Sequence, residues 1–261
     1  MTLALSIVSH GHGAQVLPLL ALLAQSPQGL VRRVWVTLNT PEPALEQALA
    51  TPGAAWSGCL DVRVLRNPRP LGFGANHNQA FGYEQQQSVP APFFVVMNPD
   101  ITWHQDPWAA MQQSAAQPGV GCVYPQQVDA HGQPQDHARR LPTPGALLRR
   151  YLGGAARRRV RVAAPDWANA ALLLFHSAAY QRIQGFDEAY HMYCEDVDIC
   201  LRLQLAGYRL AEAQGARVVH AGQRASHRQW RHLGWHLRSL WRLWHSPAYR
   251  QFQQDHARRV G

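Results

Sequence analysis

Short apolar runs alternate with longer segments of helical pattern in the first hundred residues. The apolar runs predict strands, and the segments between them predict helices. We predict strands at 3–8, 31–38, 61–65 and 93–97 and helices at 16–23, 44–50 and 75–86. The strands are apolar almost throughout, which is typical of a mostly parallel sheet with helices on both faces. The pattern therefore predicts an α/β fold.

The rest of the chain continues this pattern less regularly. Residues 119–128 predict a further strand, and residues 166–175 are again apolar. The Arg-rich and Gly-rich segment 139–161 lacks periodicity, and we interpret it as a mobile loop. Apolar positions from 190 to 205 recur with a helical period, so we predict a helix that begins close to a cluster of acidic residues.

Polar residues follow the predicted strands at the points where the strands end. In open parallel sheets, ligands bind in the crevice outside the carboxyl ends of the strands. We therefore expect one ligand-binding rim. Its members are Ser9, His10, Asn39, Asn67, Asn98 and Asp100.

The basic residues narrow the possible chemistry. The chain has a net charge of +9 and no Lys, so its 25 basic residues are all Arg. The absence of Lys excludes a P-loop lysine and a Schiff-base lysine. The positive charge favours anionic partners, which include nucleic acid, nucleotide diphosphates and anionic membrane surfaces.

Cysteine spacing and hydropathy bear on the cellular compartment. The four Cys form no CxxC pair, so we interpret them as reduced packing residues of a cytoplasmic protein. The chain shows no signal-peptide pattern and no apolar run of the roughly 20 residues that a spanning helix needs. Secretion and membrane insertion are therefore not expected.

Three clusters carry candidate chemistry. Asn98-Pro99-Asp100 follows a predicted buried strand, and the Asp100 carboxylate could bind a divalent cation there, although the same triplet also makes an ordinary turn. Residues 195–198 hold three acids. Crowded carboxylates can supply a general base, whereas acids in the first turn of a helix simply complement its dipole.

The third cluster is the glycine-containing segment 71–78. Gly72 and Gly74 at a strand-to-helix turn would let the backbone approach a nucleotide. His77 stands where a dinucleotide fingerprint has its third glycine, so a Rossmann oxidoreductase is only weakly supported.

Taken in this order, the three clusters resemble a specific family. The strongest match is formed by 184–188, 191–203 and 206–208, with further matches at Asn67, 71–74, Asn78, 97–100 and 166–171. The chain resembles family 2 glycosyltransferases of the GT-A fold, and most of all the rhamnosyltransferase-type members that build bacterial surface polysaccharides. The resemblance covers about residues 3–222. It implies a Rossmann-like, mostly parallel sheet flanked by helices, with a C-terminal helical extension.

The resemblance also implies roles for individual residues. Asp100 and His220 would bind Mg2+ or Mn2+, and Asp196 would deprotonate the acceptor hydroxyl with support from Glu195. The nucleotide-sugar donor would meet Ser9, His10, Asn39, Asn67, Gly72, Gly74, Asn78, Asn98 and Asp100. The diphosphate or acceptor side would involve Arg139, Arg140, Trp167, Asn169 and Arg202. Transfer would invert the anomeric configuration, with dTDP-rhamnose as the suggested donor.

Several positions depart from the family pattern. Asn98 replaces the first acid of the metal motif, which leaves a single carboxylate there. Asn39 stands where most relatives have a base-contacting Asp, and His10 stands where a Tyr is common. Gln184 and the Asn169-Ala170 step replace small residues and would reshape the acceptor side.

The residues after 222 differ in composition from the rest. Four of the nine Trp lie among Arg residues here, so we assign 1–222 to a catalytic domain and 223–261 to a basic helical extension. One helical face would carry Leu233, Leu237, Leu240, Trp241 and Trp244. That face either packs on the catalytic domain or lies on an anionic membrane surface near a lipid-linked acceptor. His232 and His236 have helical spacing, but without a third ligand nearby we do not expect them to bind a metal.

Two other function classes remain open from the sequence. The basic balance and the Arg-rich loop favour a nucleic-acid-binding protein, but acidic residues on the rim oppose it, and we expect no nucleic-acid partner. A sugar-phosphate nucleotidyltransferase would share the α/β framework, but it usually needs a lysine near the triphosphate. We therefore expect a cytoplasmic transferase, peripheral to the inner face of the membrane, whose partners are a nucleotide-diphosphate sugar and a glycan acceptor.

Overall fold

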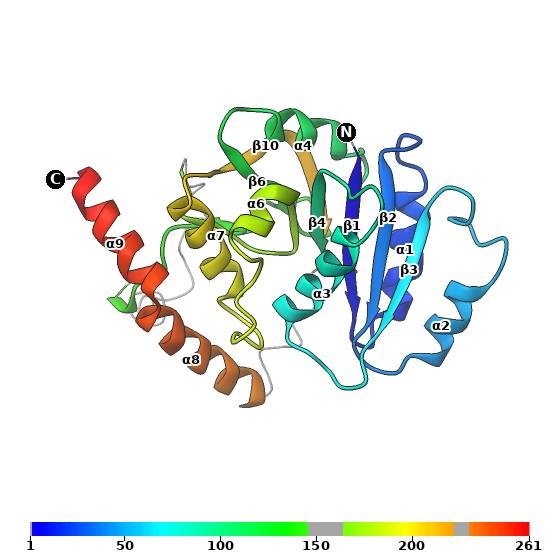
Figure 1. Cartoon of the computed structure of the whole chain (residues 1–261), viewed down its shortest axis with the longest axis horizontal. Helices are drawn as coiled ribbons and strands as arrows, with labels where there is room; N and C mark the ends of the chain where they lie inside the picture. The colour runs from blue at the N-terminus through cyan, green and yellow to red at the C-terminus, as the bar shows by residue number, and fades with distance from the viewer. Residues whose placement is uncertain (1, 146–163, 222–229, 261) are drawn as a thin grey trace.

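The computed structural model describes residues 2–145, 164–221 and 230–260. It confirms the α/β prediction. One eight-stranded sheet lies between two groups of helices, and the C-terminal helices lie at the end of the molecule far from β3 and α2 (Figure 1).

The large sheet has the order β3-β2-β1-β4-β9-β6-β10-β5. The first four strands are parallel, β9 runs antiparallel between β4 and β6, and β10 is parallel to β6. The strands are β1 Leu3–Ser9, β2 Val31–Leu38, β3 Asp61–Arg66, β4 Phe93–Met97, β5 Ile101–Thr102, β6 Val120–Val128, β9 Leu172–His176 and β10 Arg209–His220. A separate two-stranded sheet pairs β7 Ala138–Arg139 with β8 Trp167–Ala168.

The helices cover both faces of the sheet. They are α1 Gly13–Leu23, α2 Pro43–Ala50, α3 Phe73–Gln85, α4 Trp108–Ala115, α6 Ser177–Arg182, α7 Glu195–Leu205, α8 Trp230–His245 and α9 Pro247–Val260. Alternate residues of β1 serve different cores: Leu3, Leu5 and Ile7 pack with α1 and α4, while Ala4 packs with α3, α6 and α7. Burial on both faces explains why the parallel strands are apolar throughout.

The predicted helix at 190–205 begins later than expected. Tyr193 and Cys194 have φ values of 72° and 65°, in the left-handed region, and α7 begins only at Glu195. A left-handed residue cannot continue a right-handed helix, so the apolar period at Met192 and Cys194 overstated its length. The helices α1 and α3 begin two or three residues earlier than predicted.

The segment interpreted as a loop, 139–161, is only partly covered. Arg139 belongs to β7 and pairs with Trp167, so the segment begins with ordered strand rather than loop. Residues 146–163 lie outside the described residues, as does the predicted domain boundary at 222.

The C-terminal extension forms two helices, α8 and α9. Pro247 occupies the first position of α9, which suits its fixed φ and its missing N–H. The predicted apolar stripe of α8 is divided: Leu240 is buried, as is its neighbour Leu243, whereas Trp241 is 64% exposed. No helix in the described ranges is long and apolar enough to cross a bilayer.

Candidate active site

The carboxyl ends of the first three parallel strands are linked directly to one another. The backbone N–H of Asn39 donates to Ser9 O at 2.8 Å, and that of Asn67 donates to Leu38 O at 3.1 Å. The register thus places the residues after β1, β2 and β3 side by side. Because β4 pairs in parallel with β1, Asn98 follows its strand at the same edge of the sheet.

An amide network fixes the side chains along this rim. Asn39 Oδ1 accepts from the backbone N–H of Leu71 at 2.8 Å, and Asn39 Nδ2 donates to Leu71 O at 3.0 Å. These backbone partners determine the orientation of the Asn39 amide. Asn67 Nδ2 then donates to Asn39 Oδ1 at 2.9 Å and to Asn76 Oδ1 at 2.6 Å. Asn76 was missed in the sequence analysis because it lies inside a helix, one turn after its start.

A carboxylate that the sequence analysis did not single out organises the loop after β1. Glu42 Oε1 accepts from the backbone N–H of Gly11 at 3.0 Å, and Glu42 Oε2 accepts from that of Gly13 at 2.9 Å. His10, in the same loop, accepts at Nδ1 from Asn39 Nδ2 at 3.1 Å. The polar run after the second strand was the signal for Glu42.

Gly72 and Gly74 approach the chain itself at very short range. A Cβ at Gly72 would lie 2.8 Å from His191 O, and a Cβ at Gly74 would lie 2.5 Å from Cβ of Phe186. Both distances are too short for a real side chain, so these glycines are needed for α3 to pack on the 186–191 segment. This packing is a different reason for the glycines than the approach to a nucleotide that the sequence suggested.

Asp100 and His220 come together from distant parts of the chain. Asp100 precedes β5 and His220 ends β10, and these two strands pair antiparallel with His220 opposite Ile101. Asp100 Oδ2 lies 3.5 Å from His220 Nε2, and both side chains are largely buried.

This pair fits a divalent cation that takes its other ligands from a diphosphate and water. A carboxylate oxygen and an imidazole nitrogen suit Mn2+, and Asp100 Oδ2 and His220 Nε2 are close enough to bind the same ion. No group of three or more His, Cys, Asp or Glu within the described ranges could hold a metal by itself. The metal would therefore depend on its ligand for most of its coordination.

Glu195 and Asp196 begin α7, directly after the left-handed pair. Glu195 is buried, and its Oε2 has no hydrogen-bond partner in the described structure. Burial, followed by the charge of Asp196, raises the pKa of Glu195 to about 8. Burial also raises the pKa of Asp196 to about 6, although Asp196 Oδ1 accepts from the backbone N–H of Val197 at 2.8 Å. A carboxylate with a pKa near neutrality is suited to act as a general base.

Arg139 brings positive charge to Asp196. Its charge opposes the rise in the pKa of Asp196, and its guanidinium lies 5.1 Å from the centroid of the Trp167 ring. Trp167 is buried and donates from Nε1 to Arg140 O at 3.0 Å. Arg140 Nη1 lies 3.6 Å from Asp166 Oδ1 and is more exposed. The β7–β8 sheet thus holds an Arg–Trp pair whose charge acts on Asp196, while the Arg139 guanidinium itself forms an ion pair with Asp136 at 2.9 Å.

The sequence has clear relatives although no family model matches it. It is 26% identical over 184 residues to the rhamnosyltransferase WbbL of Escherichia coli, a match that covers 66% of this chain and 69% of WbbL. It is 28% identical over 190 residues to the N-acetylglucosaminyl-diphospho-decaprenol L-rhamnosyltransferase of Mycobacterium tuberculosis. That match covers 65% of this chain and 62% of the relative, so it spans less than two thirds of the relative's length.

Solved structures share the fold. The mannosyltransferase PcManGT of Pyrobaculum calidifontis, in complex with GDP-Man and Mn2+, aligns with a TM-score of 0.61 at 16% identity, over 85% of this chain and 58% of its own. TarS of S. aureus, in complex with UDP-GlcNAc, aligns with a TM-score of 0.61 at 12% identity, over 97% of this chain and 72% of its own. The chain is thus similar in sequence to rhamnosyltransferases, and it has the fold of GT-A glycosyltransferases.

Two of the predicted site residues use their side chains to connect segments of the fold. Asn78 accepts at Oδ1 from the Tyr180 hydroxyl and from the backbone N–H of Phe186, and it donates from Nδ2 to Phe186 O and Glu188. Asn169 forms a paired amide contact with buried Gln127, at 2.6 and 3.1 Å. These amides hold segments of the chain together. Their hydrogen-bonding groups are therefore largely occupied and have little capacity left to bind a nucleotide-sugar.

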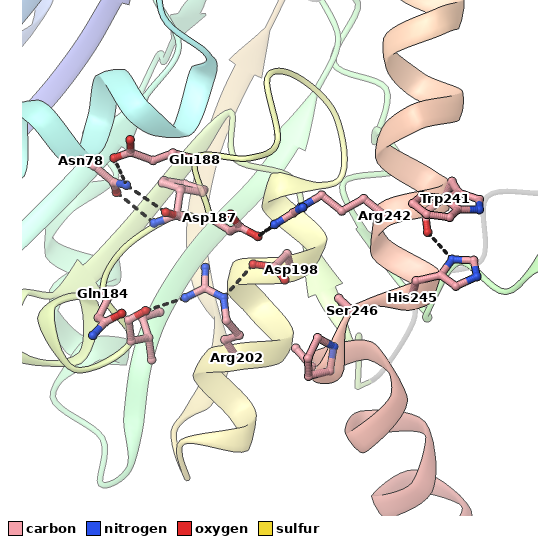
Figure 2. A pocket seen from close by; sticks show the side chains of 14 residues that line it. Asn78, Gln184, Asp187, Glu188, Asp198, Arg202, Trp241, Arg242, His245 and Ser246 are labelled. Carbon is pink, nitrogen blue, oxygen red and sulfur yellow. Dashed lines mark hydrogen bonds and ion pairs between the residues drawn. The ribbon is translucent and has the colours of Figure 1, made fainter.

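Arg202 lies on another face of α7 from Asp196. It donates to Asp198, Ile183 O and Gly185 O at 2.6 to 2.7 Å, so its guanidinium joins α7 to the turn before Phe186. Arg202 and Asp198 line a cavity of about 670 Å³ between α7 and the α8–α9 junction, where Arg242 also pairs with Asp187 (Figure 2). Arg202 is thus placed for stability, in contrast to the diphosphate role suggested by the sequence.

Proposed function

We propose that this protein is an inverting glycosyltransferase of family 2 that moves a sugar from a nucleotide diphosphate to a hydroxyl of a bacterial surface glycan. The observation that carries the proposal is the placement of two acids with raised pKa values, Glu195 and Asp196, in one domain with the Asp100–His220 pair. The two relatives named as rhamnosyltransferases support dTDP-rhamnose as the donor.

The donor would lie along the amide network at the carboxyl edge of the sheet. Ser9, His10, Asn39, Asn67, Asn98 and Asp100 belong to this edge, and Asp100 with His220 would hold Mg2+ or Mn2+. When bound, the cation neutralises negative charge that develops on the diphosphate as it leaves. Mn2+ in the mannosyltransferase neighbour supports this assignment.

Asp196 would accept the proton of the acceptor hydroxyl. The hydroxyl oxygen forms a bond to the anomeric carbon while the bond from that carbon to the diphosphate oxygen breaks, and the electron pair leaves with the diphosphate. Attack from the face opposite the leaving group inverts the anomeric configuration. Glu195 would orient the acceptor, and Arg139 and Arg140 would supply positive charge near the departing diphosphate.

A lipid-linked glycan is the proposed acceptor, because one relative is named for a sugar on diphospho-decaprenol. Such an acceptor would place the protein in the cytoplasm at the inner face of the membrane. Lipopolysaccharide, O-antigen and capsule share this acceptor chemistry. The acids beside the proposed donor site oppose a nucleic-acid partner.

A thermal-shift panel tests the donor class. UDP, GDP, dTDP and CMP would each be added with and without Mn2+, since a ligand at 100 times its Kd stabilises the fold by about 2.7 kcal/mol. We expect a Mn2+-dependent rise in Tm with a nucleoside diphosphate, and the largest rise with dTDP. No rise with any of the four nucleotides, together with a salt-sensitive rise with RNA or DNA, would refute the proposal.

A further inference from the structure

Helix α8 is held firmly on the catalytic domain through one face. The Ser239 hydroxyl donates to Met192 O at 2.8 Å, Trp244 Nε1 donates to Pro142 O at 2.8 Å, and Leu243 is fully buried. Arg242 forms an ion pair with Asp187 at 2.7 Å (Figure 2). These contacts determine which face of α8 remains exposed.

The exposed face carries an apolar stripe. Leu233, Leu237 and Trp241 follow one another at intervals of four residues and are 47%, 58% and 64% exposed. The other large hydrophobic side chains exposed in the described ranges, Leu71, Tyr83 and Val89, belong to other parts of the fold. Three large apolar residues in line on one helix form a candidate interaction surface.

Positive charge borders this stripe. α8 contains three Arg and no acidic residue. Arg238 is exposed beside the stripe, and Arg250 of α9 is exposed as well, whereas the charge of Arg242 is paired with Asp187. A helix with Leu and Trp on one face and Arg along its border is typical of helices that lie in the headgroup region of an anionic bilayer.

We propose that the face of α8 formed by Leu233, Leu237, Arg238 and Trp241 docks on an anionic lipid surface. A second copy of the chain fits this face less well, because a symmetric contact through one helix would bring like-charged Arg residues together. The apolar side chains would enter the boundary between headgroups and acyl chains, and the Arg side chains would meet lipid phosphates. The proposal goes beyond sugar transfer and stands on α8 alone.

The membrane surface would lie close to the proposed catalytic acids. Four residues of α8 contact the segment just before α7: His232 and His236 contact Tyr193, Trp235 contacts His191, and Ser239 bonds to Met192. Docking of α8 would therefore hold Glu195 and Asp196 near the plane of the bilayer, where a lipid-linked acceptor is found.

Vesicle sedimentation of the full chain tests the proposal. We expect binding to vesicles of phosphatidylcholine with phosphatidylglycerol, little binding to phosphatidylcholine alone, and release at high salt. The double variant Leu233→Gln/Leu237→Gln should bind at least about tenfold more weakly. Val89→Gln is the matched control, because Val89 is also 58% exposed but lies away from α8.

A charge reversal provides a second arm. Arg238→Glu should weaken binding at low salt, whereas Arg182→Glu, also at an exposed position, should not. Unchanged Tm values would show that the variants fold. Equal binding of vesicles by the wild type and the double variant would overturn the proposal. The proposal would also be overturned if the wild type formed a dimer that did not bind vesicles and the double variant did not form this dimer. The nucleotide panel is independent of this outcome, so failure of one does not imply failure of the other.

Discussion

The hydroxyl of Tyr193 lies 2.9 Å from Nδ1 of His232 and so joins α8 to the left-handed residue two positions before Glu195. Such a backbone conformation is unfavourable for a residue with a side chain and persists only where its surroundings hold it. We infer that α8 helps to hold the turn that presents the two acids.

Tyr193→Phe tests this relationship. The variant keeps the ring contact with His236 but removes the hydrogen bond, so we expect a loss of stability of about 1 kcal/mol. The value of kcat should fall while the donor KM stays near that of wild type, because the acids and not the donor edge are displaced. Denaturant unfolding and steady-state kinetics would measure both effects, with Tyr83→Phe at a partly exposed position as the control. An unchanged kcat would show that α8 does not hold the turn.

Asp196→Asn tests the proposed base. Asparagine keeps the size of the side chain and cannot accept the proton, so kcat should fall by roughly 10²- to 10⁴-fold. Nucleotide binding should persist, because the donor edge is untouched, and a Tm shift with the preferred nucleotide would verify it. Asp106→Asn, at an exposed position just before α4, should retain activity. Full activity in Asp196→Asn would exclude this residue as the base.

The rate should depend on pH through the same carboxylate. The base acts only when it is deprotonated, so kcat should rise with pH around pH 6, the pKa of Asp196 in the folded protein. Arg139→Gln removes a positive charge that favours the carboxylate, so the pKa of Asp196 should increase and the rise should move to higher pH. A profile of kcat from pH 5 to 9 for both proteins would measure the shift. An identical midpoint would mean that Arg139 does not act on Asp196.

Stability should have the opposite dependence on pH. Burial raises the pKa of both acids above their unfolded values, so the folded state binds more protons than the unfolded state between about pH 4 and 8. Stability is thus fully present at low pH and is lost as pH rises through about 6 and 8. The double variant Glu195→Gln/Asp196→Asn should lose less stability between pH 5 and 8.5. Calorimetry of both proteins at pH 5 and pH 8.5 would measure these losses of stability. Equal losses in the wild type and the double variant would show that ionisation of the two acids does not destabilise the fold.

Cation binding should depend on both Asp100 and His220. With two protein ligands, removal of either one should weaken Mn2+-dependent nucleotide binding by at least about tenfold. Isothermal titration of the preferred nucleotide with Asp100→Ala and His220→Ala would measure this loss. Nucleotide binding without Mn2+ should change little in either variant. Wild-type affinity in both variants would place the cation elsewhere.

The sequence predicted the carboxyl edge of the sheet well because this edge depends on where the strands end. Strands that are apolar throughout have clear limits, and parallel pairing brings Asn39 and Asn67 together without further information. It was harder to predict from the sequence which side of a helix each residue occupies and what that side contacts. Asp196 and Asp198 are two positions apart, and a rotation of about 200° places them on opposite sides of α7. The spacing of Asp198 and Arg202 indicated a helical ion pair, which the structure contains, but it did not show that Arg202 also binds the carbonyls of Ile183 and Gly185.

Backbone conformations without a sequence signal were also missed. Tyr193 and Cys194 adopt left-handed φ values, which are predictable from sequence mainly where the residue is glycine. The start of α7 was therefore predicted too early. The packing role of Gly72 and Gly74 was not predicted for a related reason. Their neighbours, His191 and Phe186, lie more than a hundred positions away in the chain, and only the packed structure brings them into contact.

The meeting of Asp100 with His220 also has a consequence for biosynthesis. The two residues are joined through β5 and β10, and β10 follows every other strand of the described sheets in the sequence. A nascent chain that already displays the complete amide network still lacks half of this pair. Any ligand that requires both side chains is therefore captured only after β10 has joined the sheet, so capture of that ligand marks completed folding of the eight-stranded sheet.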